Sequence, residues 1–374
     1  MIDVKQLTQY LKSISVDFYT GVPDSLLSSF CDYIEETPDT NNVIVPNEGN
    51  AVALAAGHYL STGKYSLVYM QNSGLGNAIN PITSLTHKDV YSIPVVYLIG
   101  WRGEPGIKDE PQHKKQGKIT PKLLKLLDID FKIIKPNTTI EDIKNIFEDK
   151  FIEKLRNNES VALLVSKNSF KKYSINHSND NPMSREEAIN VIVSYLGEED
   201  VIVSTTGKAS RELFECRENN GSGHSCDFLT VGSMGHSSSI ALGISENTDK
   251  NVFVFDGDGA ILMHMGSLAL IGTQNINNFH HILFNNSAHE SVGGLPTIMN
   301  KINITEIAEN CGYHKTYYAG DKEELENILP SFLNNNGRVF LLVDVNLLSR
   351  GDLGRPTRTP IENKIDFIKQ IRGE

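Results

Sequence analysis

The sequence has little that would hold a chain in a membrane or in an oxidising compartment. No apolar run approaches the roughly 18–20 residues that a membrane-spanning helix needs. The first residues show an amphipathic helical pattern and lack the apolar core of a signal peptide. Four cysteines occur without Cys-x-x-Cys spacing, which indicates neither a zinc site nor a disulfide framework; they are Cys31, Cys216, Cys226 and Cys311. We therefore expect a cytoplasmic globular protein.

Positive charge is also scarce. The 374 residues include 35 Lys and Arg against 46 Asp and Glu, a formal net charge of -11. This surplus of acid argues against a nucleic-acid or membrane partner, because surfaces that bind those partners are basic. No predicted strand leads into Gly-x-Gly-x-x-Gly, which disfavours a dinucleotide dehydrogenase. An anionic ligand of this chain would need cations that are concentrated locally.

What the sequence does contain is a regular alternation of short apolar runs with segments of helical period. Continuous apolar strands separated by helices predict parallel sheets covered on both faces. Strands are expected at 16–21, 42–47, 65–72, 93–100, 131–135 and 161–167, and in a second series at 201–206, 227–232, 251–257, 280–286, 314–320 and 338–345. Helices are expected at 1–14, 24–36, 48–60 and 140–155, and between the strands of the second series.

A polar stretch rich in Ser and Asn separates the two series and is typical of a linker. The prediction is α/β, with two doubly wound parallel-sheet domains at 1–167 and 184–374 joined by a linker at 168–183. The second domain includes a basic segment, 349–360, that fits neither the strand nor the helix pattern. In such sheets ligands bind at the carboxyl ends of the strands, so those ends are the places to search for a site.

The most informative motif lies in the second domain. A strand runs into Asp256-Gly257-Asp258-Gly259, and after about 25 further residues a second strand runs into Asn285-Asn286. Strand ends that lie side by side would place a carboxylate and a carboxamide oxygen around one hard cation, and Mg²⁺ prefers such ligands. The motif also resembles the start of a calcium loop, but no Glu follows where an EF-hand needs one. Gly-Asp-Gly alone would be an ordinary turn.

Gly-Asp-Gly followed at this spacing by Asn-Asn resembles the signature of thiamine diphosphate-dependent enzymes. The resemblance implies that Mg²⁺ and thiamine diphosphate are the cofactors, with the Asp258 carboxylate, the Asn286 side chain and the Ala288 carbonyl as metal ligands. It adds Gly259 and Ala260 as cofactor-binding residues. It also implies a pyrimidine-binding domain followed by a diphosphate-binding domain. Many relatives insert a middle domain, for which this chain has only a short linker.

The first domain carries the other half of the resemblance. Glu48, Ala51 and Ala55 follow a strand in the family pattern Glu-x-x-Ala-x-x-x-Ala, which implies that Glu48 binds and activates the aminopyrimidine ring. Without the second motif, a Glu in the first turn of a helix would most simply stabilise the helix dipole. Gly74 and Gly76 resemble a glycine-rich turn close to the cofactor, where their role is backbone geometry.

Two further segments resemble cofactor-binding loops of the family. The segment STTGKAS implicates Thr206 and Gly207 in contacts to the cofactor. The segment VGSMG implicates Gly232, whose carbonyl would accept a hydrogen bond from the 4′-amino group, together with Ser233 and Met234. The Met234 side chain would wedge the cofactor into its bent form.

Four segments point to one branch of the family. Residues 21–25, 101–117, 289–297 and 349–357 resemble decarboxylases of phosphonopyruvate and sulfopyruvate. The resemblance implies decarboxylation of 3-phosphonopyruvate to phosphonoacetaldehyde and CO₂ in phosphonate biosynthesis. The alternatives are the same chemistry on sulfopyruvate and, further away, an acetolactate synthase-like carboligase. A catalytically silent relative would be expected to lack Glu48 or the Asp258 and Asn286 pair, and all three are present.

Phosphonopyruvate would bring roughly three negative charges to an acidic chain, so clustered cations are expected near it. One loop holds Arg102, Lys108, Lys114, Lys115 and Lys118, and the tail holds Arg350, Arg355 and Arg358. The alternative is a solvated loop and a tail that contacts a second subunit. The residues predicted to bind substrate are Ser25, Arg102, Lys108, Gly293, Gly294, Arg350 and Arg355.

Two residues beside Glu48 are predicted to be catalytic. His113 is a candidate proton relay in an acidic loop, although a lone loop histidine is more often structural. Asp24 is either catalytic or the N-cap of the following helix. Since the family completes its site across a subunit interface, the resemblance also implies a homodimer or a larger homo-oligomer.

Overall fold

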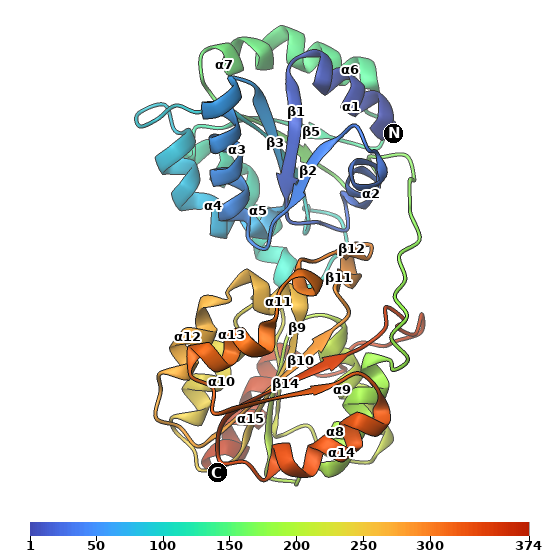
Figure 1. Ribbon diagram of the computed structural model, residues 1–374. Coiled ribbons are helices and arrows are strands. Elements are labelled where there is room, and N and C mark those ends of the chain that lie inside the picture. The colour runs from blue at the N-terminus through green and yellow to red at the C-terminus, as the bar shows by residue number, and fades with distance from the viewer. Residues whose placement is uncertain (374) are drawn as a thin grey trace. The chain divides into compact units, whose positions relative to one another are not determined.

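The computed structural model describes residues 1–373, which divide into two compact units. Unit 1 is Met1–Asn176 and unit 2 begins at His177, a boundary that falls inside the segment 168–183 (Figure 1). The described residues form no third unit between them. No helix within residues 1–373 has both the length and the apolar character needed to cross a bilayer.

Unit 1 is built on a six-stranded parallel sheet with strand order β2-β1-β3-β4-β6-β5. Its strands are β1 (Val16–Gly21), β2 (Asn41–Ile44), β3 (Tyr65–Gln71), β4 (Val95–Gly100), β5 (Asp130–Ile134) and β6 (Val161–Val165). Its helices are α1 (Val4–Ser13), α2 (Ser28–Glu36), α3 (Glu48–Thr62), α4 (Leu75–Pro81), α5 (Pro111–Leu126), α6 (Ile140–Ile146) and α7 (Ile152–Arg156). The shorter helical turns are η1 (Asn72–Gly74), η2 (Ile82–Thr86) and η3 (Phe147–Phe151).

Unit 2 repeats this architecture with strand order β13-β14-β10-β9-β7-β8. Its strands are β7 (Val201–Ser204), β8 (Asp227–Leu229), β9 (Val252–Gly257), β10 (Asn278–Asn285), β13 (Lys315–Ala319) and β14 (Gly337–Asp344), and a small hairpin joins β11 (Ala288–His289) to β12 (Leu295–Pro296). Its longer helices are α8 (Arg185–Tyr195), α9 (Lys208–Asn219), α10 (Ser237–Ser245), α13 (Ile304–Cys311), α14 (Lys322–Leu333) and α15 (Pro360–Arg372). The shorter ones are α11 (Asp258–Met263), α12 (Gly266–Gly272), η4 (Glu290–Val292) and η5 (Met299–Lys301).

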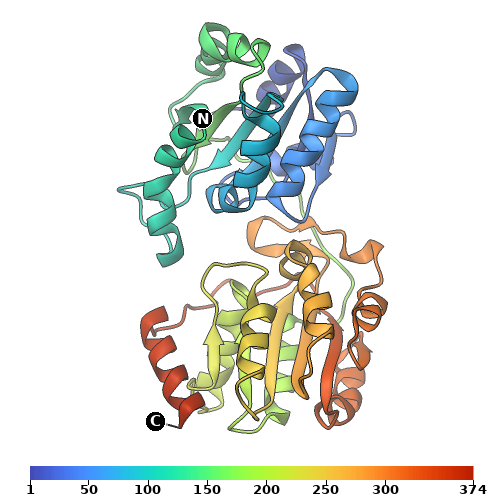
Figure 2. The same ribbon diagram turned by 90° about the vertical axis from the view of Figure 1, so that its left-hand side faces the viewer.

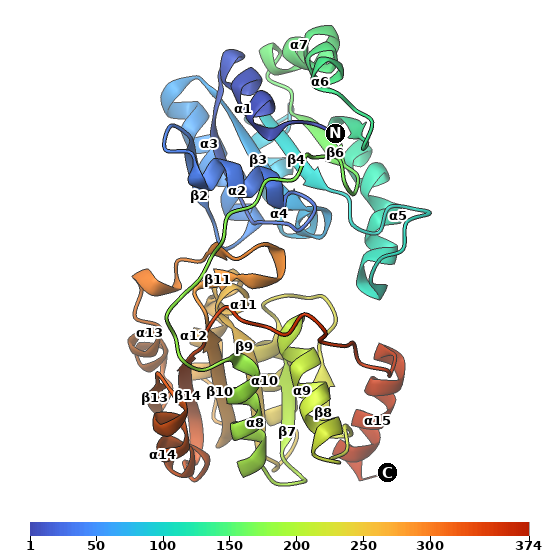
Figure 3. The same ribbon diagram turned by 90° about the vertical axis from the view of Figure 1, so that its right-hand side faces the viewer.

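Helices cover both faces of each sheet, as the two side views show (Figures 2 and 3). In unit 2, the side chains of β9 show why both faces are covered. Val252 and Val254 belong to one apolar cluster, whereas Phe253 and Phe255 belong to the other. Since successive side chains of a strand point to opposite faces, a strand that is apolar throughout needs cover on both sides. The predicted fold class is therefore confirmed.

Every strand predicted from the sequence is present, with ends that differ by three residues or fewer. The hairpin of β11 and β12 was not predicted, because strands of two residues leave no periodic pattern. Helix α15 was not predicted either. It packs on the edge strand β8, where the Asn363 amide donates to the Asp227 carbonyl at 2.8 Å and accepts from the Leu229 N–H at 3.2 Å.

Two local predictions were wrong. The predicted helix 24–36 begins only at Ser28, with Leu27 as its N-cap, so Asp24 is not the N-cap residue. Residues 101–117 are not one loop, because α5 begins at Pro111 and carries Lys114, Lys115 and Lys118. Proline suits the first turn of a helix, and Pro111 starts this one.

Candidate active site

Glu48 lies where the sequence places it, at a strand end of unit 1. It is the first residue of α3, whose N-cap Asn47 accepts a hydrogen bond from the Gly49 N–H at 2.8 Å. The Glu48 side chain is buried, and burial raises the pKa of its carboxyl group. Asn77 on α4 donates its amide to Glu48 Oε2 at 2.8 Å. A buried carboxyl group with a raised pKa suits proton exchange with a nitrogen heterocycle.

The glycine-rich turn of η1 leaves room for this side chain. A Cβ atom on Gly74 would lie 2.5 Å from Glu48 Cγ, whereas one on Gly76 would meet nothing within 4 Å. Gly74 is thus required by close approach to Glu48, and Gly76 is not. Asn77 was missed in the sequence, although it belongs to the same segment as both glycines.

A second cluster in unit 1 brings together four residues predicted to act on the substrate. Arg102 Nη1 donates to Ser25 Oγ at 2.9 Å, and Arg102 Nη2 pairs with Asp109 Oδ1 at 2.6 Å. His113, in the first turn of α5, contacts Asp109 Oδ1 through Nδ1 at 2.9 Å. Lys108 lines the same cavity as Ser25 and Arg102. Asp109, which contacts both Arg102 and His113, was not identified in the sequence.

The electrostatics of this cluster are dominated by Asp109. Partial burial alone would raise the pKa of Asp109, but hydrogen bonds from Arg102 and His113 lower it far below its usual range. Burial lowers the pKa of His113 in spite of the hydrogen bond to Asp109. The imidazole is therefore held mainly neutral at pH 7, with Nδ1 oriented toward Asp109.

Asp24 lies at the end of β1 and is fully buried. Its Oδ2 accepts from the Leu26 N–H at 3.0 Å, while Oδ1 has no hydrogen-bond partner among the described residues. Burial raises the pKa of Asp24 to about 6. A Cβ atom on Gly100 would lie 3.0 Å from Asp24 Cγ, so the end of β4 also has to be glycine. A buried carboxyl group that is only partly satisfied is typical of a functional position.

In unit 2 the predicted metal ligands lie at the ends of two paired strands. Gly257 at the end of β9 is paired with Phe284 near the end of β10. Asp258 is buried, accepts from Thr297 Oγ1 at 2.6 Å, and its pKa is raised to about 6 by burial. Asn286 is also buried. Its Oδ1 accepts from the Ala288 N–H at 3.1 Å.

These donors fit a hard cation. Asp258 is a buried carboxylate with no ion-pair partner anywhere in residues 1–373, so a cation would compensate its charge. The described residues hold no group of three or more His, Cys, Asp or Glu side chains that could bind a metal ion. The predicted set is of another type, since it uses one carboxylate, one carboxamide and one backbone carbonyl.

A partly buried ionic network supports the loop that carries Asn286. Arg185 donates to both oxygens of Glu212, at 2.6 and 2.8 Å, and to Glu290 Oε2 at 2.7 Å. Lys208 pairs with Glu290 Oε1 at 2.9 Å, and Asn286 Nδ2 donates to Glu290 Oε2 at 3.3 Å. No sequence pattern could have indicated the pairs that Arg185 and Lys208 form, because their members lie far apart along the chain.

The remaining predicted cofactor-binding residues gather around the same strand ends. Gly232 N donates to Thr206 Oγ1 at 3.0 Å, which joins the two predicted loops. Gly207, Gly232 and Ser233 have φ values of 102°, 77° and 48°, so both loops turn sharply. Such left-handed turns are accessible to glycine and more rarely to serine.

Met234 lies near Gly259, since a Cβ atom on Gly259 would be 3.3 Å from Met234 Cε. The same atom would be 3.0 Å from His289 Nδ1, so His289 belongs to this group although it was not predicted. Burial lowers the pKa of His289 to about 4, which keeps it neutral. Ala260 is buried in the first turn of α11.

Gly293 and Gly294 form the turn between β11 and β12, with φ values of 125° and 87°. The basic segment 349–360 was expected to offer its positive charge to the substrate, but Arg350 forms ion pairs within unit 2. Arg350 pairs with Glu186 at 2.8 Å, with Asp352 at 3.1 Å and with Glu215. Arg355 is exposed. Within unit 2 the charge of Arg350 is thus already matched by carboxylates.

The comparisons with known proteins agree with the class that this fold and these strand-end residues define. The N-terminal TPP-binding domain of thiamine pyrophosphate enzymes matches residues 4–123, and the C-terminal TPP-binding domain matches residues 205–345. Thiamine pyrophosphate is another name for thiamine diphosphate. The two units therefore correspond to the two cofactor-binding domains of this class of enzyme.

Curated relatives narrow the class to a family. A phosphonopyruvate decarboxylase of Streptomyces viridochromogenes is 32% identical and covers 97% of this chain and 93% of its own length. A phosphonopyruvate decarboxylase of Streptomyces hygroscopicus is 31% identical, with 97% and 92% covered. A sulfopyruvate decarboxylase of Methanosarcina acetivorans is 27% identical, with 85% of each chain covered. The chain belongs to the phosphonopyruvate decarboxylase family of thiamine diphosphate enzymes.

Proposed function

We propose that this chain decarboxylates 3-phosphonopyruvate to phosphonoacetaldehyde and CO₂, with thiamine diphosphate and Mg²⁺, as a step of phosphonate biosynthesis. The observation that carries the reaction class is the buried Glu48, held by Asn77 at the end of a strand. A silent relative would have no reason to keep a carboxyl group buried and close to Gly74. The choice of substrate rests on the near full-length similarity to phosphonopyruvate decarboxylases.

Bound thiamine diphosphate supplies an electron sink for the pair of electrons that departing CO₂ leaves behind. Glu48 would hold its aminopyrimidine ring and exchange a proton with it through the carboxyl group. Asp258 and Asn286 would hold Mg²⁺ and, through it, the diphosphate, with Ala288 adding a backbone carbonyl. Gly259 at the start of α11 leaves space for close approach of a phosphate.

His113 and Asp24 are proposed to transfer protons to and from the substrate. His113 Nδ1 contacts Asp109, so Nε2 is the atom that is free to take up a proton and then pass it to the carbon that has lost CO₂. The Asp24 carboxyl group, with a pKa of about 6, can hold or release a proton near neutral pH.

Sulfopyruvate is the second candidate substrate, because a sulfopyruvate decarboxylase matches 85% of the chain. An acetolactate synthase-like carboligase is less well supported, since the described residues hold no middle domain. The direct test is CO₂ release from phosphonopyruvate, sulfopyruvate and pyruvate, measured side by side with both cofactors present. We expect the highest kcat/KM with phosphonopyruvate, and a preference for either competitor would overturn the proposal.

The metal assignment has its own test. Asp258→Ala should lose affinity for thiamine diphosphate in the presence of Mg²⁺, and chelator-treated wild type should regain activity only when Mg²⁺ and cofactor return together. Asp256→Ala, at the neighbouring carboxylate, is a poor control because Asp256 contacts buried His281. Asp249→Ala in the exposed loop before β9 is the better one. Wild-type cofactor affinity in Asp258→Ala would remove the metal assignment.

We also propose a homodimer or a larger homo-oligomer in the cytoplasm. Glu48 belongs to unit 1 and Asp258 to unit 2, and the family resemblance implies that such halves meet across a subunit interface. A cytoplasmic location is supported by four cysteines that form no disulfide. Mixing inactive Glu48→Gln with inactive Asp258→Ala chains should restore partial activity after subunit exchange. Fully active monomers in sedimentation experiments would contradict the assembly.

A further inference from the structure

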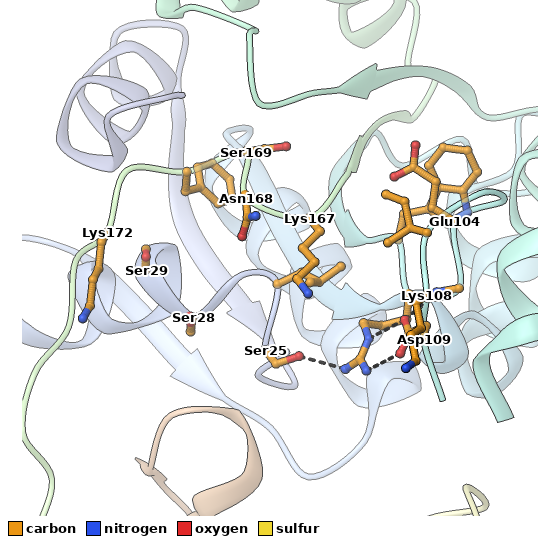
Figure 4. Close-up of a pocket in the computed structure, with 16 residues that line it drawn as sticks. Ser25, Ser28, Ser29, Glu104, Lys108, Asp109, Lys167, Asn168, Ser169 and Lys172 are labelled. Atoms are coloured by element: carbon orange, nitrogen blue, oxygen red, sulfur yellow. Dashed lines mark hydrogen bonds and ion pairs between the residues drawn. The ribbon is translucent and has the colours of Figure 1, made fainter. Parts of the chain in front are cut away.

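Unit 1 contains a cavity of about 480 Å³ at the carboxyl end of its sheet. Its lining comes from three segments, which follow β1, β4 and β6 (Figure 4). The first two segments contain Ser25, Arg102 and Lys108, which the sequence had indicated. The third begins at Lys167, directly after β6, and no motif pointed to it. Strand ends are where sheets of this kind bind ligands.

Arg102 brings less free charge to this cavity than its position suggests. Its Nε and Nη2 atoms donate to the two oxygens of Asp109, at 2.9 and 2.6 Å, so the pair is bidentate and nearly neutral. Asp109 also accepts from the Gly103 N–H at 2.7 Å, which fixes its orientation. Arg102 can still offer hydrogen bonds, but another group has to supply net positive charge.

Two lysines supply the net positive charge of the cavity. Lys108 and Lys167 line the cavity, and neither has an ion-pair or hydrogen-bond partner among residues 1–373. The Lys167 side chain extends toward Ser25, whose hydroxyl oxygen already accepts from Arg102 and whose proton remains free to donate (Figure 4). Together with the nearly neutral Arg102–Asp109 pair, the two lysines leave an excess of two positive charges in this part of the cavity.

Other charged residues lie at the margins. Lys172 is on the opposite side of the cavity, beyond Ser28 and Ser29, and the Glu104 carboxylate points away from Ser25 (Figure 4). An uncompensated charge of about two units attracts a dianion more strongly than a monoanion, since Coulomb energy scales with the product of charges. A phosphonate resembles a phosphate ester in carrying between one and two negative charges at pH 7.

We propose that this cavity binds the phosphonate group of the substrate, with Lys167 and Lys108 supplying charge and Ser25 and Arg102 supplying hydrogen bonds. The inference rests on the proposed function and adds Lys167 as a residue that determines specificity. It also gives a physical reason for preferring a phosphonate to a sulfonate, which carries only one negative charge. Arg350 and Arg355 of the tail are not needed for this recognition.

The test measures binding of phosphonoacetate, an unreactive phosphonate, to the enzyme loaded with thiamine diphosphate and Mg²⁺, by titration calorimetry. Lys167→Ala should weaken binding roughly 10- to 100-fold, as expected for the loss of one charge-assisted contact. Lys167→Arg should retain most of the affinity. Lys171→Ala is the matched control, because Lys171 pairs with Asp3 at 3.4 Å and does not line the cavity. Sulfoacetate should bind wild type more weakly than phosphonoacetate.

Kinetics then separate this inference from the proposed function. Lys167→Ala should lower kcat/KM for phosphonopyruvate by the same factor, and by more than it lowers kcat/KM for pyruvate, which has no phosphonate group. If wild type decarboxylates phosphonopyruvate but Lys167→Ala binds phosphonoacetate as wild type does, the phosphonate subsite is wrong and the proposed function stands. If phosphonoacetate binds through Lys167 but phosphonopyruvate yields no CO₂, the proposed function fails and the phosphonate site is supported.

Discussion

Asp24 offers a sharp test of whether a buried carboxylate is kept for function at a cost in stability. Its pKa of about 6 exceeds the ordinary value of 3.8 because burial disfavours the charged form. The difference of about two units corresponds to about 3 kcal/mol at 1.36 kcal/mol per unit. Because the folded-state pKa is raised, this cost is absent below about pH 4, grows between about pH 4 and pH 6, and stays constant at higher pH.

Asp24→Asn removes the ionisation and keeps an oxygen that can accept from the Leu26 N–H. The new amide nitrogen would lack an acceptor, which costs on the order of 1 kcal/mol or more at every pH. The free energy of unfolding of the variant, relative to wild type, should therefore increase by about 3 kcal/mol between pH 4 and pH 8. For a unit of this size, 1 kcal/mol shifts Tm by roughly 2–4 °C, so the change is readily measured.

The assay is thermal unfolding at a series of pH values, paired with kcat for phosphonopyruvate at pH 7. Asp89→Asn, an exposed site in the same unit, serves as the control. If Asp24 is catalytic, the kcat of Asp24→Asn should fall by about 100-fold or more. The stability of the variant relative to wild type should be greater at pH 8 than at pH 4. A stability difference that does not change with pH would refute the burial argument, and a wild-type kcat would leave Asp24 with a structural role only.

Two further predictions follow from close contacts in unit 1. Gly74→Ala should push the Glu48 side chain by about 1 Å, because carbon atoms separate to about 3.5 Å or more. The variant should lower kcat about 100-fold with little change in Tm. Gly76→Ala should leave kcat unchanged, and equal effects of the two variants on kcat would contradict the account. Asp109→Asn should lower the pKa of His113 further, since Asp109 stabilises the protonated form of His113. The pH dependence of kcat should therefore move to lower pH. An unchanged pH dependence would exclude proton transfer by His113.

Much of the fold was predictable because buried parallel strands leave an unmistakable record in the sequence. Runs such as those of β4 and β6 are apolar at every position, and glycine or a polar residue ends each one. Asp258 was predictable for a related reason, since it follows the buried strand β9 and opens a helix. Glu48 opens a helix after the partly exposed edge strand β2, and the family pattern Glu-x-x-Ala-x-x-x-Ala identified it. Local order along the chain is sufficient to place residues of this kind.

Pairs that form across long stretches of chain were not predictable. Asn77 reaches Glu48 from another helix, and Arg185 reaches Glu290 over more than a hundred residues, so neither partner is marked by spacing. The ion pairs of Arg350 were not predictable for the same reason. Arg350 was expected from the sequence to be a free cation, and in the structure it pairs with carboxylates. Lys167 is the reverse case, an ordinary lysine until the fold places it in a cavity.

The most direct test of the central claim is the exchange rate of the C2 proton of thiamine diphosphate bound to the enzyme, followed by NMR after mixing with D₂O. This measurement needs no substrate and reports on Glu48 alone. Wild type should accelerate exchange strongly, and Glu48→Gln should bind the cofactor but exchange the proton about 100-fold more slowly or worse. Equal exchange rates in wild type and Glu48→Gln, with the cofactor bound in both, would contradict the account.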